Sequence, residues 1–206
     1  AACGIDAFIH AEEAYTSTAA SPFSDAMAEK AMELIGENIR RFVANRTDVE
    51  AAEAMMVGSL LAGIAFSFAR LGNVHAMSHP VSAFFDVPHG VANAVLLPVV
   101  AEYNALADHG RYYKIYNYIS EIPAYEDEFE PMMLVDAIRS LCKAIGIPAN
   151  LTEAINRAGK TGSISRETIE EKIEAMAADA MKSGNIAVNP RSSRQCDIEM
   201  LYRKAL

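Results

Sequence analysis

Apolar residues recur at three- and four-residue spacing along almost the whole chain, and no segment alternates apolar with polar residues over a sustained length. This spacing is typical of helices that bury one face, whereas a half-buried strand alternates every second residue. At 206 residues, 51% of them hydrophobic, the chain can also bury a substantial core. We therefore predict an all-α fold, a multi-helix bundle.

One predicted helix begins near Thr47, continues through Phe68 and is apolar nearly all round. Such a helix normally lies in the centre of a bundle, and Gly58 and Gly63 would let its neighbours approach closely. We therefore expect a central position for it. Its apolar run is shorter than the roughly 20 residues that cross a bilayer and ends in Arg70, so no membrane span is predicted.

Helix-start and helix-stop signals divide the rest of the chain into further elements. We predict a first helix that ends before Ser21, a helix capped by Ser24 or Asp25 and running to about Asn45, a short helix with His75 and His79, a helix from His89 towards Leu106, a helix over 132–147, a loop over Thr161–Ser165, a helix over 165–182 and a last helix over 196–206.

Charge and cysteine content exclude several functional classes. The net charge of −9 and a pI near 5.0 argue against a nucleic-acid-binding surface, which needs clustered Lys and Arg. The three cysteines are an odd number in a chain too large to need disulfides, and none forms a CxxC pair. We therefore expect a protein of the reducing cytoplasm.

Histidines are concentrated in two short patches. His75, His79 and His89 fall within fifteen positions, and His10 follows Asp6 by one helical turn. Residues four apart lie on one face of a helix, so Asp6 and His10 can reach one ion together, and His75 and His79 share a face in the same way. One carboxylate with two or three neutral imidazoles suits Fe, Zn, Ni or Co better than Mg or Ca.

The alternative interpretation is that these histidines are ordinary surface or core groups. A single Asp-His pair at this spacing can also be simple helix electrostatics. Two such pairs with a third histidine nearby favour the metal site. The residues alone lead no further than this.

Three longer segments resemble the iron-containing, or group III, alcohol dehydrogenases. They are GIDAFIHAEEAY, AGIAFSFARLGNVHAMSHPVSAFFDVPHGVANAVLLP and NPRSSRQCDIEMLYRKAL. The resemblance covers essentially the whole chain, and its H-x-M-x-H-x9-H-G-V-A-N-A pattern is highly specific. Two positions depart from the family pattern, Ser82 for a common glycine and Val99 for a common histidine, so no substrate is named from the sequence.

Carried over residue by residue, the resemblance implies four metal ligands, which are Asp6, His10, His75 and His89. It implies Fe(II), although the same ligands would accept Zn, and a role for the metal in polarising the oxygen of a small alcohol or aldehyde substrate.

Three further residues have roles implied by the resemblance. His79 matches a histidine near the nicotinamide and the substrate that is not a ligand. It is the expected catalytic residue, which could pass the hydroxyl proton onward, and the alternative is that it only orients a ligand. Phe66 matches an aromatic position beside the cofactor and the substrate. Asn185 aligns with a position near the substrate in some members.

The resemblance also implies an N-terminal α/β domain with a glycine-rich loop for NAD(P), yet no strand with a Gly-rich turn is present in this chain. We therefore expect residues 1–206 to be the helical metal-binding C-terminal domain, with the dinucleotide-binding domain absent. Such a chain should not turn over alcohol alone, and self-association into a homo-oligomer would cover its open interdomain face. The alternatives are a metal-dependent lyase of the dehydroquinate-synthase-like type and a non-catalytic helical metal-binding module.

Overall fold

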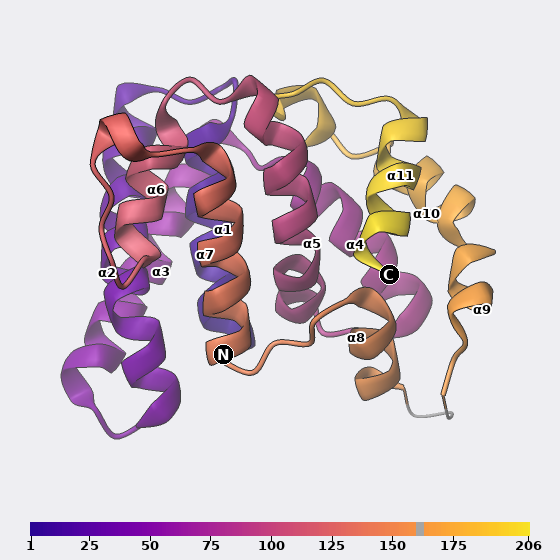
Figure 1. Ribbon diagram of the computed structural model, residues 1–206, viewed down its shortest axis with the longest axis horizontal. Coiled ribbons are helices and arrows are strands. Elements are labelled where there is room, and N and C mark those ends of the chain that lie inside the picture. Colours follow the sequence, from indigo (N-terminus) through magenta and orange to yellow (C-terminus); the bar gives the residue numbers. More distant parts are fainter. Residues whose placement is uncertain (160–162) are drawn as a thin grey trace.

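The computed structural model describes residues 1–159 and 163–206. Throughout these residues the regular structure is helical and no strand is present, so the all-α prediction is confirmed (Figure 1). The α-helices are α1 (Ala2–Thr16), α2 (Pro22–Ala44), α3 (Val49–Ala69), α4 (Asn73–Phe85), α5 (His89–Asn104), α6 (Arg111–Ile119), α7 (Pro131–Ala144), α8 (Leu151–Ala158), α9 (Arg166–Glu170), α10 (Ile173–Ala180) and α11 (Gln195–Ala205), with 3₁₀ turns η1 (Ala105–Ala107), η2 (Glu126–Glu128) and η3 (Ile186–Val188).

Helix α5 is the central helix of the bundle. It packs against α1, α4, α7, α8 and α11, and Figure 1 shows it between one group of helices that includes α1 to α3 and another that includes α8 to α11. Twelve of its sixteen residues are buried, which explains why its sequence is apolar on most sides. This central position brings the start of α5 close to both α1 and α4.

The expectation that the apolar helix at residues 49–69 lies in the centre is wrong. Helix α3 packs with one side on α1 and α2, while Met56, Leu60 and Phe68 on its outer side are 74%, 65% and 64% exposed. The close approach expected at Gly58 is confirmed, because a Cβ there would lie 2.7 Å from Ile35 Cγ1. A Cβ at Gly63 would meet nothing within 4 Å. Apolar composition alone therefore does not show which helix is enclosed.

Two of the described helical segments, Val49–Ala69 and His89–Ala107, are long and apolar enough to cross a membrane by length and composition. The core helix of a water-soluble domain meets the same two criteria, and the second segment is mostly buried inside the bundle. The expected absence of a membrane span therefore stays a prediction.

The start of α2 differs by one turn from the prediction. Ser21, rather than Ser24 or Asp25, is the N-cap, and its hydroxyl accepts from the Ser24 backbone N–H while Ser24 Oγ accepts from the Ser21 backbone N–H. Pro22 occupies the first helical position, where a missing N–H costs no hydrogen bond. This reciprocal cap explains why the helix begins at the proline.

The predicted helix over 165–182 is divided in two. Ser165 caps the first part by accepting from the Thr168 backbone N–H, as its sequence signal predicts. The chain then turns at Glu171 and Lys172 before α10 begins. The predicted loop over Thr161–Ser165 lies partly outside the described residues, which resume at residue 163.

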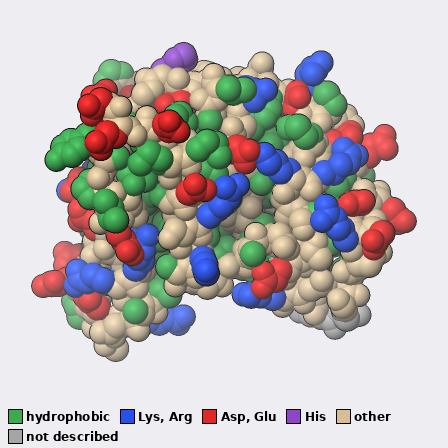
Figure 2. Space-filling model, in the orientation of Figure 1, with side chains coloured by type: hydrophobic (Ala, Val, Ile, Leu, Met, Phe, Trp, Pro, Cys, Tyr) green, Lys and Arg blue, Asp and Glu red, His purple; other side chains and the backbone are tan. Residues whose placement is uncertain are grey.

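Basic and acidic side chains are intermingled on the face shown in Figure 2, and Lys and Arg form no separate cluster there. Several of them form ion pairs between helices. Glu102 of α5, for example, accepts from both Arg139 of α7 and Lys204 of α11. This face therefore lacks the basic patch that phosphate binding requires.

Candidate metal centre

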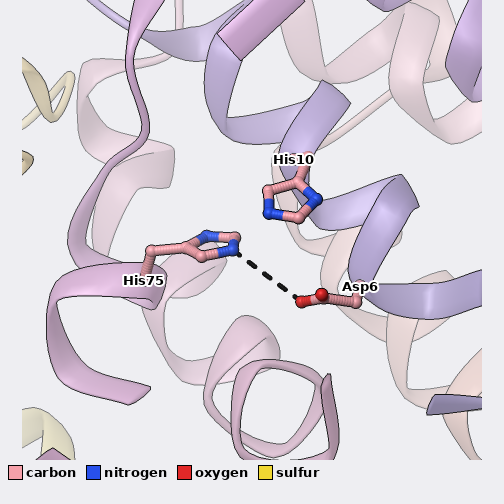
Figure 3. A group of neighbouring side chains, drawn as sticks. All are labelled: Asp6, His10 and His75. Carbon is pink, nitrogen blue, oxygen red and sulfur yellow. Dashed lines mark ion pairs between the residues drawn. The ribbon is translucent and has the colours of Figure 1, made fainter. Parts of the chain in front are cut away.

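Three helices supply the candidate metal ligands. Asp6 and His10 project from successive turns of α1, and His75 projects from the first turn of α4 towards them, as Figure 3 shows. His89 is the first residue of α5. A Cβ on Gly90 would lie 2.9 Å from the Ala2 carbonyl carbon, so only glycine allows α5 to begin this close to α1.

The ligand atoms of three of these residues converge on one point, and His89 falls outside that group of three. Asp6, His10 and His75 each offer an atom within 4.8 Å of the other two, which makes them a group that could hold a metal ion. Asp6 Oδ1 lies 3.8 Å from His75 Nε2 and 3.9 Å from His89 Nε2. Two atoms bound to one ion at about 2.0–2.2 Å are at most about 4.4 Å apart, so both separations are compatible with a shared ion.

The cluster contains more lone pairs than donors. Asn93, one turn after His89, places its amide Nδ2 2.6 Å from Asp6 Oδ1 and 3.0 Å from Nε2 of both His75 and His89. An amide has two hydrogens, so it cannot donate to three acceptors at once. The Asn93 Oδ1 is itself buried without a partner among the described residues. A cation would satisfy this excess of lone pairs, so the residues present fit a bound metal.

Burial keeps three of the imidazoles neutral, those of His10, His79 and His89. Burial and, after it, the nearby His75 lower the pKa of His10 to about 4. Burial likewise lowers the pKa of His79 and of His89, with neighbouring histidines adding to the effect. Neutral imidazoles keep the lone pairs that a metal requires at neutral pH.

A carboxylate that the sequence interpretation missed lies behind His75. Glu13 of α1 is only 4% exposed, and its Oε2 lies 2.6 Å from His75 Nδ1. The sequence held a signal for it, since Asp6, His10 and Glu13 follow one another at the spacing of a single helix face. Asn93 was also missed, although it follows His89 by four residues.

Two of the three other predicted site residues lie beside the cluster. The exposed His79 stacks on His89 with ring centroids 5.2 Å apart, and the half-buried Phe66 stacks on His10 at 4.7 Å. Asn185 lies between α10 and η3, where its backbone N–H donates to Ser183 Oγ. No hydrogen bond joins Asn185 to the cluster within the described part of the chain, so its predicted role gains no support from the geometry.

Comparison with known proteins identifies the family. The model of the Fe-containing alcohol dehydrogenase family, C-terminal, matches residues 1–206. The chain is 40% identical over 206 residues to 1,3-propanediol dehydrogenase of Citrobacter freundii and 36% identical to lactaldehyde reductase of Escherichia coli K12; each match covers 100% of this chain and 50% of the relative. This chain belongs to the Fe-containing alcohol dehydrogenase family and corresponds to its C-terminal part.

A solved structure agrees with this assignment. The crystal structure of a 1,3-propanediol oxidoreductase superposes with a TM-score of 0.88 at 39% sequence identity, over 100% of this chain and 51% of that chain. The helical bundle is therefore the fold of the C-terminal domain in this family. The chain spans about half the length of the curated relatives it matches.

Proposed function

We propose that this chain is the metal-binding half of an NAD(P)-dependent alcohol dehydrogenase that interconverts a small alcohol and its aldehyde or ketone. The observation that carries the proposal is the group of Asp6, His10 and His75 with His89 beside it, because this cluster has more lone pairs than hydrogen-bond donors. The ligand set suits Fe(II), the metal in the family's name, and would also accept Zn.

A bound divalent metal would supply Lewis-acid chemistry to the oxygen of the substrate. Two residues of this chain, Phe66 and His79, shape the surroundings of the metal and the substrate oxygen. The 28° stacking of Phe66 on the His10 ring shields one side of the cluster from water and restricts rotation of the imidazole. His79 stands at the exposed edge of the cluster with a lowered pKa, so it can accept a proton from a hydroxyl group and pass it to solvent.

Hydride transfer needs a dinucleotide site, and the described residues contain no strand with a Gly-rich turn that would form one. Residues 1–206 would act with a nucleotide-binding half, and the match of this chain to only 50% of the length of its relatives supports such a second half. The relatives named for 1,3-propanediol and lactaldehyde support a small alcohol or aldehyde as substrate. The isolated chain would hold metal without oxidising alcohol, and self-association would cover its open apolar surface on α3.

Metal analysis tests this proposal. The metal-free chain is reconstituted anaerobically with Fe(II) or Zn(II), freed of excess ion and analysed for metal content. We expect one ion per wild-type chain and almost none in the double variant His75→Ala, His89→Ala. The matched control is His109→Ala, which removes an exposed histidine outside the cluster and should retain one ion. Equal metal content in the wild type and the double variant would contradict the ligand assignment.

The predicted inactivity has its own test. Purified chain loaded with metal is incubated with NAD or NADP and a series of small alcohols, and absorbance of the reduced nicotinamide is followed. No turnover is expected, whereas a steady rate that depends on chain concentration would show that residues 1–206 are a complete enzyme.

A further inference from the structure

The carboxylate of Glu13 joins α1 to the start of α4. Its Oε1 accepts a 2.7 Å hydrogen bond from the Val74 backbone N–H, and its Oε2 lies 3.4 Å from the His75 backbone nitrogen and 2.6 Å from His75 Nδ1. Both glutamate and imidazole are almost fully buried, at 4% and 1% exposed. A carboxylate in this position, with three N–H groups directed at it, is held in one orientation.

The start of α4 is built to receive this carboxylate. Its N-cap is Gly72, which has no side chain to cap the helix, so side chains from elsewhere accept from its first backbone N–H groups: Asn189 from Asn73, and Glu13 from Val74 and His75. A Cβ on Gly72 would lie 2.9 Å from Glu13 Oε1. The glycine therefore keeps open the space that the carboxylate fills.

The contact with Nδ1 determines which His75 nitrogen faces the cluster. Both oxygens of Glu13 already accept from backbone N–H groups, so its carboxylate acts here as an acceptor and His75 Nδ1 is the donor of the 2.6 Å contact. In the neutral ring the Nε2 atom then has a free lone pair, and that atom is the one 3.8 Å from Asp6 Oδ1. A metal ligand whose other nitrogen donates to a carboxylate is fixed in tautomer and orientation and becomes a stronger base.

We propose that Glu13 is a positioning residue of the metal centre, which fixes the tautomer and ring orientation of His75 from behind while it caps α4. This inference rests on the proposed metal site. Loss of such a partner typically weakens metal binding by about 10- to 100-fold.

The first test is Glu13→Gln. Glutamine keeps the side-chain length and can still accept from the Val74 backbone N–H, which preserves the cap, but its NH2 group then faces His75 Nδ1 and can only donate, which favours the opposite tautomer of His75. We expect the Zn(II) dissociation constant, measured by chelator competition, to rise about 10- to 100-fold. With Co(II) as probe, we also expect a changed visible absorption spectrum, because the geometry around the metal relaxes. A residue that acts only as a cap would leave that spectrum unchanged.

Glu12→Gln is the matched control. Glu12 is the neighbour of Glu13 on α1 and is as buried, but no hydrogen bond within the described residues joins its side chain to His75 or to the start of α4, and glutamine keeps its length. This variant should bind Zn(II) with wild-type affinity and give the wild-type Co(II) spectrum.

A second measurement uses the unmodified chain. ¹⁵N shifts of the His75 ring in the metal-free protein should show a protonated Nδ1 and a bare Nε2. An Nε2-protonated ring, or a Glu13→Gln variant with wild-type affinity and Co(II) spectrum, would overturn the role of Glu13 and leave the metal site standing. A wild-type chain that binds neither ion would overturn both proposals.

Discussion

The contact between the start of α5 and the start of α1 offers a sharp test of how the fold builds the site. In Gly90→Ala, the new methyl group would lie 2.9 Å from the Ala2 carbonyl carbon and 3.1 Å from Asp6 Cβ. Ordinary van der Waals contact begins at 3.4 Å, and the Ala2 carbonyl oxygen would lie closer to the methyl group than the carbon does, so the helices must separate by more than about 0.5 Å. Overpacking of this kind costs about 1–3 kcal/mol.

The same displacement acts on the metal centre, because Asp6 and His10 lie on α1 and His89 lies on α5. Metal–ligand distances tolerate about ±0.2 Å, less than the required movement. We therefore expect Gly90→Ala to lower the melting temperature by roughly 2–12 °C, at about 2–4 °C per kcal/mol for a chain of this size, and to weaken Zn(II) binding.

Thermal unfolding followed by circular dichroism and chelator competition for Zn(II) would measure the two effects. The matched control is Gly63→Ala, where a Cβ meets nothing within 4 Å and the substitution should stabilise the helix by about 0.5–1 kcal/mol. A Gly90→Ala variant with the melting temperature and Zn(II) affinity of the wild type would refute the reasoning.

Three other expectations follow from particular contacts. Burial raises the pKa of the Cys142 thiol to about 12, so only about one molecule in 10⁴ is thiolate at pH 8. Mass spectrometry after iodoacetamide treatment should therefore find the exposed Cys3 and Cys196 modified and Cys142 intact from pH 7 to pH 9. Rapid modification of Cys142 would contradict its packing. Arg111→Ala removes a bidentate ion pair with Asp25 and should lower the free energy of unfolding by about 2 kcal/mol, measured as a lower urea midpoint. An unchanged midpoint would mean that the pair is not formed in solution. Zn(II) at 100 times its dissociation constant should stabilise the folded chain by about 2.7 kcal/mol, measured in calorimetry as a higher melting temperature that a chelator reverses. An unchanged melting temperature would argue against a site specific to the folded state.

Helical periodicity is a local property, and most of the helices could be predicted from it. The ends of helices were predicted less well, because competing caps differ by small free energies. At α2, both Ser21 and Ser24 can accept from a backbone N–H, and the neighbouring Pro22 decides the start. The position of α3 could not be predicted, since an apolar surface does not indicate whether another helix of the same chain covers it.

In the candidate site too, contacts within one helix could be predicted from the sequence, and contacts between helices could not. The pairing of Asp6 with His10 is visible in the sequence, because four residues make one helical turn. The meeting of Glu13 with His75 joins residues 62 apart, and that of Asn93 with Asp6 joins residues 87 apart. Such contacts depend on how α1, α4 and α5 cross, which no spacing within one helix determines.

The central claim is that one ion binds where α1, α4 and α5 meet. Its most direct test is a crystal structure of the chain soaked anaerobically with Zn(II), with data collected on both sides of the zinc absorption edge. We expect one anomalous peak at about 2.0–2.2 Å from a carboxylate oxygen of Asp6 and from an imidazole nitrogen of each of His10, His75 and His89. No peak at that point, or a zinc ion bound only by other residues, would contradict it.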